Sequence, residues 1–257
     1  MHPLTLHDNT VPTKITQLSR FVELFSEGEP PRHALFLQAP APLASATSAA
    51  GAADQLLVID PPAGLTSRFR IEGDAAVLFT GPPGDAGLPL VQTMAGGVAH
   101  VRVGDHFLDV YAQRNGCIVH LPALGILCSG AYGSTAALPA IGPGSTGAEE
   151  LDALRLLARL VRQRRLQFFI PHAGALGNDP AEVMARLAAD VAYLHSLRRV
   201  VPAARQAGDL TDALGALAES LLPPERRSPL AHAVHSRNLN TLRAAFAQQS
   251  NSHELPM

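Results

Sequence analysis

The chain has 257 residues, of which 47% are hydrophobic and 16% charged, and its formal net charge is −2. This composition is typical of a well-packed globule and excludes a disordered or coiled-coil chain, and the length favours one large α/β domain over two ordinary domains. The basic residues are scattered, so no electrostatic footprint for nucleic acid is present and we expect no nucleic-acid partner.

The sequence gives no sign of a membrane span or an export signal. No run of about 18 uncharged apolar residues occurs, and the opening MHPLTLHDNT lacks both the basic start and the apolar stretch of a signal peptide. We therefore expect a cytoplasmic protein without a membrane partner. Cys117 and Cys128 cannot build a disulfide framework, and we expect them to be small apolar strand residues.

The first third of the chain has the pattern of strands separated by loops. Short apolar runs of strand length occupy Ala34 to Gln38, Gln55 to Asp60 and Ala75 to Thr80. The residues from Ala39 to Ala53 are too small to pack and predict a loop. The third strand must end at Gly81-Pro82-Pro83-Gly84, because proline has no amide hydrogen to donate to a ladder.

An antiparallel meander is predicted next. Val101 and Val103 alternate with polar residues up to Gly104-Asp105, a favoured two-residue hairpin turn, and residues 107–112 form the returning strand. A second pair, 117–121 and 125–128, surrounds a turn at Pro122.

Beyond this meander the hydrophobic period changes from two to about 3.6, which predicts helices. Leucines at every third position mark a helix over 151–161, and 166–170 is one more buried strand. Asp179-Pro180 is a helix cap followed by proline at the first helical position. Two further helices are predicted, over Thr211 to Leu222 and from Ser228 onward.

This order of elements predicts an α/β body over residues 1–201 and a C-terminal helical extension over 202–257, packed on the same domain. Arg162, Arg164 and Arg165 end the first long helix, where cations favour the negative end of the helix dipole. An anion site or partner site at these arginines is the alternative.

The motifs, taken in order, resemble those of the metallo-β-lactamase superfamily over roughly Ala34 to Val200. The corresponding segments are Leu57-Val58-Ile59-Asp60, Thr80 to Pro89, Gln113-Arg114-Asn115-Gly116, Ser129-Gly130-Ala131 and Pro171-His172-Ala173-Gly174. The resemblance implies a four-layer αββα sandwich in the α/β class, and in active members a metal-dependent hydrolase.

The resemblance also shows which metal ligands have been replaced. At the positions where the family has three loop histidines, a turn histidine, a bridging aspartate and a last histidine, this chain has Gly81, Pro83, Ala86, Gln113, Ala131 and Ala173. Asp85 alone matches a ligand position. A catalytic zinc needs about three protein ligands at roughly 2 Å, and glycine, proline and alanine supply none.

We therefore expect no bound metal, no cofactor and no catalytic residue of the usual kind. The predicted function is that of a binding, scaffolding or regulatory subunit, with an unknown protein partner or a homo-oligomer. The alternative is a hydrolase of the same superfamily with an atypical or relocated active site.

A few single residues have two interpretations. Asp85 precedes Ala86 to Val91, which has the pattern of a short helix start, so Asp85 is a helix cap or a remaining ligand or base. His172 is a strand-end histidine bonded to backbone, or it belongs with Asp85 to a residual pocket. His106 and His120 are expected near turns, with a new metal site as the alternative. His232 and His235 are expected on a helix surface.

Overall fold

The computed structural model describes residues 13–39, 55–69, 71, 74–82, 87–91, 96–114, 116–206 and 220–253. The chain divides into two compact units. The first comprises residues 1–130 and 167–173, and the second comprises 131–166 and 174–257.

The first unit begins with a five-stranded sheet in the order β1-β2-β3-β4-β5. Its described strands are β1 (Thr13–Ser19), β2 (Val22–Glu27), β3 (Arg32–Ala39), β4 (Gln55–Ile59) and β5 (Asp74–Leu78). All neighbours are antiparallel except β4 and β5, which are parallel and are connected through the short helix α1 (Leu65–Arg68). The β3, β4 and β5 strands were predicted, whereas the β1–β2 hairpin was not.

The second sheet of this unit is the predicted meander, in the order β10-β9-β8-β7-β6. Its strands are β6 (Val98–Val103), β7 (His106–Gln113), β8 (Gly116–Leu121), β9 (Ile126–Gly130) and β10 (Phe168–Pro171). Val103 pairs with His106 around Gly104-Asp105, which confirms the predicted hairpin turn. The last strand, β10, lies parallel to β9.

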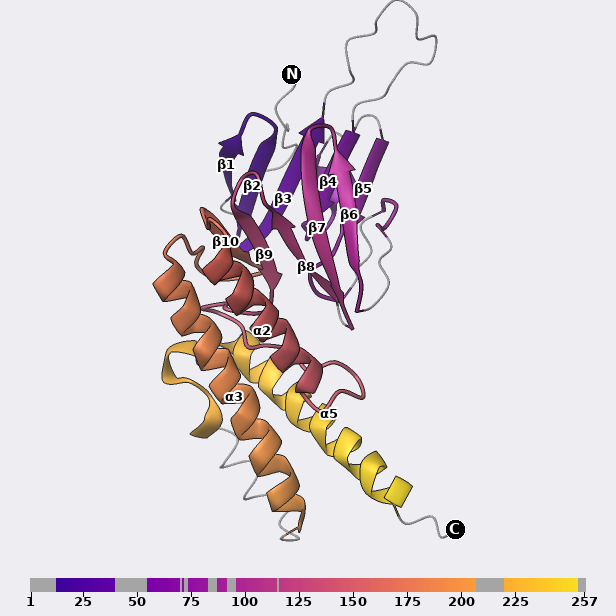
Figure 1. Ribbon diagram of the computed structural model, residues 1–257, viewed down its shortest axis with the longest axis vertical. Coiled ribbons are helices and arrows are strands. Elements are labelled where there is room, and N and C mark those ends of the chain that lie inside the picture. The colour runs from indigo at the N-terminus through magenta and orange to yellow at the C-terminus, as the bar shows by residue number, and fades with distance from the viewer. Residues whose placement is uncertain are drawn as a thin grey trace, which may run out of the picture. The chain divides into compact units, whose positions relative to one another are not determined.

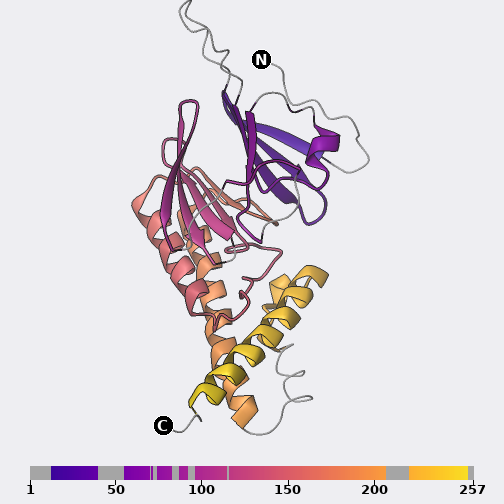
Figure 2. The same cartoon turned by 90° about the vertical axis from the view of Figure 1, so that its right-hand side faces the viewer.

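Alternation along the strands builds two apolar clusters. Leu35 and Leu37 face a cluster that joins residues of both sheets, and Figure 2 shows the two sheets as separate layers. Phe36 faces the opposite side of the first sheet, where its ring centroid lies 5.2 Å from that of Phe69. Because each fully buried side chain of this size stabilises the fold by about 1.5–3 kcal/mol, both faces of the first sheet contribute to its stability.

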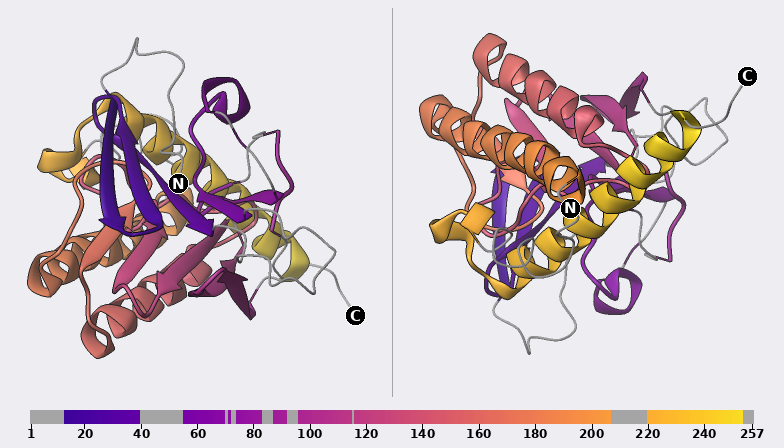
Figure 3. Two further views of the ribbon diagram at one scale, coloured as in Figure 1. Left: turned by 90° about the horizontal axis from the view of Figure 1, so that it is seen from above. Right: turned by 90° about the horizontal axis from the view of Figure 1, so that it is seen from below.

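Helices dominate the second unit. They are α2 (Ala148–Gln163), α3 (Pro180–Gln206), the 3₁₀ turn η1 (Pro224–Arg226) and α5 (Pro229–His253). Figures 1 and 3 show α2 and α3 side by side and α5 crossing them. The Asp179 carboxylate accepts a hydrogen bond of 3.0 Å from the amide of Ala181, as predicted for a cap.

The extents of the helices bear on the predicted organisation. Helix α3 continues through Pro202 to Gln206, so no helix boundary lies at 201, and the division there stays a prediction. The helix predicted over Thr211 to Leu222 lies largely outside the described residues. In the described part of the chain, no helix is both long and apolar enough to cross a membrane.

The segment 87–91 differs from its prediction as a helix start. The amide of Val77 donates to the Pro89 carbonyl, and the amide of Val91 donates to the Val77 carbonyl, both at 2.8 Å. Leu90 thus forms a parallel bridge to β5. The prediction of a helix is wrong for these residues, because β5 offers an open edge whose backbone groups they satisfy.

Candidate functional site

The site predicted by the motifs lies where β4 and β5 end in the first unit. Asp60 follows β4, and its carboxylate accepts a 2.7 Å hydrogen bond from the amide of Thr80 and another from the Thr80 hydroxyl. Asp60 has φ of 53°, in the left-handed region that aspartate tolerates better than most residues. Both carboxylate oxygens are therefore bound by Thr80, two residues beyond the end of β5.

Two glycines allow the backbone at Thr80 to approach the second sheet. A Cβ on Gly116, where φ is 126°, would lie 2.3 Å from the Thr80 carbonyl oxygen. A Cβ on Gly130 would lie 2.8 Å from the same oxygen. Gly81, by contrast, has open space around its hypothetical Cβ. The end of β5 is thus held by close contact between backbones, which only glycine at 116 and 130 permits.

His172 reaches the same end of the unit from β10. Its amide donates to the Gly130 carbonyl at 2.7 Å, and its carbonyl accepts from the amide of His33 at 3.1 Å. Its Nδ1 lies 3.9 Å from Oδ2 of Asp60, with the His172 side chain 48% exposed and that of Asp60 8% exposed. The strand ends therefore place one half-exposed imidazole beside one nearly buried carboxylate.

The two cysteines are buried strand residues, as predicted, in β8 and β9. Burial raises the pKa of both thiols, and the nearby negative charge of Asp60 raises each pKa further. The Cys117 thiol donates to the carbonyl of Phe79 at 3.3 Å. Both groups are neutral thiols near pH 7, and a metal would require thiolates.

The residues predicted to replace metal ligands are distributed as follows. Gly81 follows Thr80, Gln113 ends β7, and Ala173 is buried and bridges to Arg32. Ala131 is the first residue of the second unit. Pro83, Asp85 and Ala86 lie outside the described residues, as does any pocket formed by Asp85.

These donors do not fit a catalytic zinc. Among the described residues, no three histidine, cysteine, aspartate or glutamate side chains gather in a way that could hold a metal ion. The available pair, Asp60 and His172, consists of a carboxylate already bound by Thr80 and a single imidazole. A zinc that activates water needs at least one more strong ligand.

The remaining candidate histidines are scattered. His120 is buried, with Nδ1 3.8 Å from Oδ2 of Asp109. Burial lowers the pKa of His106, which is partly buried. His232 is exposed as predicted, but the surface prediction is wrong for His235, because it is buried with Nδ1 2.9 Å from the Tyr193 hydroxyl.

A buried polar network in the second unit was not predicted. The Asp190 carboxylate accepts a 2.6 Å hydrogen bond from the amide of Gly133 and pairs with the Arg226 guanidinium. Asn238 accepts from the amide of Ile141 at 2.8 Å, and Glu150 accepts from the amide of Gly142 at 2.9 Å. These side chains bind the backbone of the segment that connects β9 to α2. The residues are up to 97 positions apart in the chain, so no local sequence pattern reveals them.

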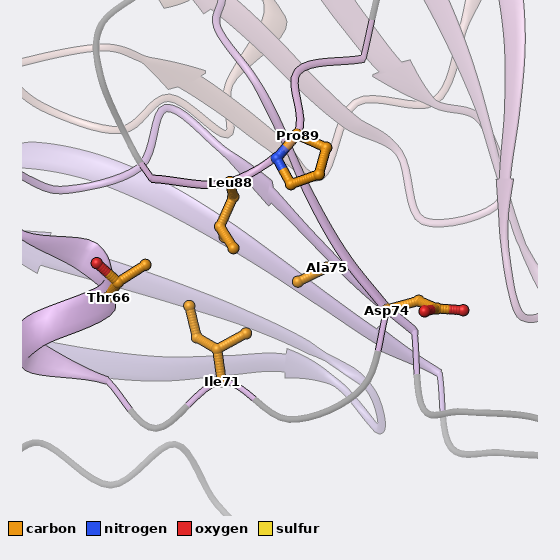
Figure 4. Close-up of a pocket in the computed structure, with 6 residues that line it drawn as sticks. All are labelled: Thr66, Ile71, Asp74, Ala75, Leu88 and Pro89. Carbon is orange, nitrogen blue, oxygen red and sulfur yellow. The ribbon is translucent and has the colours of Figure 1, made fainter.

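A shallow groove of about 490 Å³ opens elsewhere on the first unit (Figure 4). Its lining is polar and apolar in about equal parts and comprises Thr66, Ile71, Asp74, Ala75, Leu88 and Pro89. Ile71 and Leu88 belong to the cluster on the side of the first sheet away from the second sheet. The groove contains neither Asp60 nor His172 and is separate from the strand-end site.

Comparison with known proteins defines the fold. No family model matches the chain, and no curated protein matches it either. An inverting sec-alkylsulfatase from Pseudomonas sp. superposes with a TM-score of 0.60 at 12% identity, over 95% of this chain and 52% of that protein. A β-lactamase domain protein from Burkholderia ambifaria superposes with a TM-score of 0.54 at 14% identity, over 95% and 89%.

This chain has the metallo-β-lactamase fold. The predicted α/β sandwich with a helical C-terminal region is therefore confirmed, as is the resemblance to that superfamily. At these identities the likeness concerns the fold alone. The chain spans about half the length of the alkylsulfatase, at 52%.

Proposed function

We propose that this metallo-β-lactamase-fold protein has no metal-dependent hydrolase activity and acts through its surfaces, as a binding, scaffolding or regulatory subunit. The observation that carries the proposal is the donor set at the strand ends. Asp60 is bound by Thr80, His172 is the single imidazole beside it, and Gly81 and Ala173 occupy positions where the family has histidines.

The chemistry of zinc supports this proposal. Water bound to a catalytic zinc is acidified to a pKa near 7 only when the protein holds the ion firmly with about three ligands. Among the described residues, Asp60 and His172 would together supply at most two ligands, even though the Asp60 carboxylate keeps lone pairs beside its hydrogen bonds to Thr80. Two ligands fall short of the about three that a catalytic zinc requires.

The test compares zinc binding by the natural chain with binding by a variant that restores the family's ligands. This variant carries Gly81→His, Pro83→His, Ala86→His, Gln113→His, Ala131→Asp and Ala173→His. Isothermal titration calorimetry with zinc on untagged protein should show no stoichiometric binding by the natural chain and a clear gain in the restored variant. Stoichiometric, tight binding by the natural chain would reject the proposal.

A second candidate function rests on the Asp60–His172 pair, which resembles an acid–base pair. The His172 imidazole could accept a proton from an attacking water and return it to the leaving group, while the Asp60 carboxylate lies 3.9 Å from its Nδ1. The substrates to test are an activated ester and a secondary alkyl sulfate, the class in the name of the structural relative. Turnover that disappears in His172→Ala, with an unchanged melting temperature, would favour this candidate, and equal rates in both proteins would reject it.

A further inference from the structure

Strand β6 directs a regular set of its backbone groups away from β7, at the edge of the second sheet. It pairs with β7, and no strand of the described part of the chain lies on its other side. The amide of Ala112 donates to the Gly97 carbonyl at 3.0 Å, which fixes the phase of the ladder. Because bonded pairs alternate in an antiparallel ladder, Ala99, Val101 and Val103 bond to β7. Val98, His100 and Arg102 therefore direct their backbone groups to the open edge.

The same three residues carry exposed side chains. Val98 is 53% exposed, the His100 side chain is 77% exposed, and Arg102 is exposed. The six-residue strand β6 therefore exposes both side chains and outward backbone groups along its open edge. Another strand can reach this edge without displacing any described part of the fold.

The neighbouring strand β7 extends this exposed surface. Phe107 is 61% exposed and stacks under the Arg102 guanidinium, whose carbon lies 5.3 Å from the ring centroid. Asp109 pairs with His100, with 2.8 Å between Oδ1 and Nδ1. Tyr111 lies opposite Val98. The surface thus has the stacked Arg102 and Phe107 at one end, Val98 and Tyr111 at the other, and the His100–Asp109 pair in the middle.

We propose that β6 pairs in antiparallel fashion with β6 of a second copy of this chain, with His100 opposite the second copy's His100. Val98 then lies opposite the second copy's Arg102, and all three outward residues of each strand form bonded pairs. The pairing would continue the sheet across a twofold axis, as isologous dimers do. It goes beyond the function proposed above and does not depend on the absence of metal chemistry.

The side chains are self-complementary in this register. Across the four strands, Phe107 of β7 would lie beside Arg102 of β6. Arg102 would in turn lie beside Val98 of the second copy, and that Val98 beside Tyr111 of the second copy. Arginine therefore faces an apolar residue and not another arginine, and each His100 retains its own Asp109. A register shifted by two residues in one direction would place Val98 opposite Gly104 in the turn. A shift of two residues in the other direction would place Arg102 opposite Gly96, before the start of β6.

Site-directed cross-linking tests the register directly. His100→Cys should be joined into a covalent dimer by a short bis-maleimide, because bonded cross-strand partners have Cα atoms about 5.5 Å apart. The matched control is Val98→Cys, whose equivalents would be offset by four residues, roughly 13 Å along the strand. It should not cross-link alone, but it should when mixed with Arg102→Cys. The natural cysteines give little background, because both are buried with raised thiol pKa values.

Sedimentation of the full chain tests the dimer itself. Val98→Lys should weaken dimerisation about tenfold, because it places a cation opposite Arg102 twice per dimer, whereas Val98→Asp should not weaken it. Ile15→Ser removes an apolar side chain of 39% exposure from β1, the edge of the other sheet, and should have no effect. A protein that stays monomeric at high concentration, or equal cross-linking of His100→Cys and Val98→Cys, would overturn the proposal.

Discussion

The strand-end site of the first unit and the polar network of the second unit use different means to hold their segments. At the strand ends, the backbone of Thr80 lies against Gly116 and Gly130, and one carboxylate, Asp60, is bound locally. In the second unit, buried ionisable side chains from distant elements bind backbone amides, as Asp190 binds that of Gly133.

The comparison shows where this chain places its buried charges. A metal-dependent active site needs ionisable groups that face one another with unoccupied lone pairs. Here the buried carboxylates of the described helical unit, Glu150 and Asp190, bind backbone amides or an opposite charge. The strand ends of the first unit form a structural junction that is packed through glycine.

The largest effect is expected from a methyl group added at that junction. Gly116→Ala would force a Cβ to within 2.3 Å of the Thr80 carbonyl oxygen at a positive φ, so we expect a loss of more than about 4 kcal/mol of unfolding free energy. The matched control, Gly81→Ala, meets nothing within 4 Å and should change little. Thermal unfolding followed by circular dichroism measures both variants. Similar melting temperatures for the two would contradict the claim that close backbone contact at Gly116 holds the strand ends together.

Breaking the buried ion pair tests the other side of the comparison. Arg226→Ala leaves Asp190 buried without a counter-charge, which typically costs about 3–5 kcal/mol. The control is Arg162→Ala at the exposed end of α2, with an expected change within about 0.5 kcal/mol. Chemical denaturation of the two variants gives the comparison. Equal losses of unfolding free energy in the two variants would mean that the Asp190–Arg226 ion pair does not stabilise the second unit.

The pH dependence of stability tests the state of Asp190. Burial raises the pKa of Asp190 from 3.8 to about 6, against the opposing effects of Arg226 and the Gly133 amide. The folded state therefore binds more protons than the unfolded state between these values, so this contribution is present at low pH and lost as pH rises through about 6. The unfolding free energy of the natural protein relative to Asp190→Asn should fall by roughly 3 kcal/mol over that window. A relative stability that rises with pH would show that the charge of Arg226 affects the pKa of Asp190 more than burial does.

A smaller difference in stability is expected between variants of the Asp60 carboxylate and of the exposed His172 imidazole. Asp60→Ala removes the acceptor for the Thr80 amide and hydroxyl, with an expected loss of about 2 kcal/mol. His172→Ala should cost less than about 0.5 kcal/mol, because its side chain is half exposed and its backbone bonds remain. Urea unfolding measures both. The reverse order would give His172 a larger structural role than its contacts indicate.

Much of the sheet architecture could be predicted from the sequence. Apolar runs and the Gly104-Asp105 turn predicted β3 to β10 because apolar patterning and turn chemistry are local. The β1–β2 hairpin was missed because its turn, at Arg20 and Phe21, has no glycine or proline. Segment 87–91 was misassigned because Asp85 was interpreted as the cap of a short helix, whereas the pairing of this segment with Val77 depends on tertiary structure.

The candidate site was predicted only in part. The motif order located Asp60, Gly81 and His172, which the fold places in one unit. The sequence could not show that Thr80 binds both oxygens of Asp60, since that contact joins residues 20 positions apart. Nor could it show which elements position Asp190, whose partners Gly133 and Arg226 lie 57 and 36 positions away.

Elemental analysis of untagged protein tests the central claim most directly. Because no three metal-ligating side chains gather among the described residues, and Gly81 and Ala173 stand where the resemblance to the family implies histidines, we predict far less than one equivalent of zinc, iron or manganese per chain, even after expression with added metal. The ligand-restored variant, purified in parallel, should carry metal and shows that purification does not strip it. One or two firmly bound metal ions per natural chain would contradict the account.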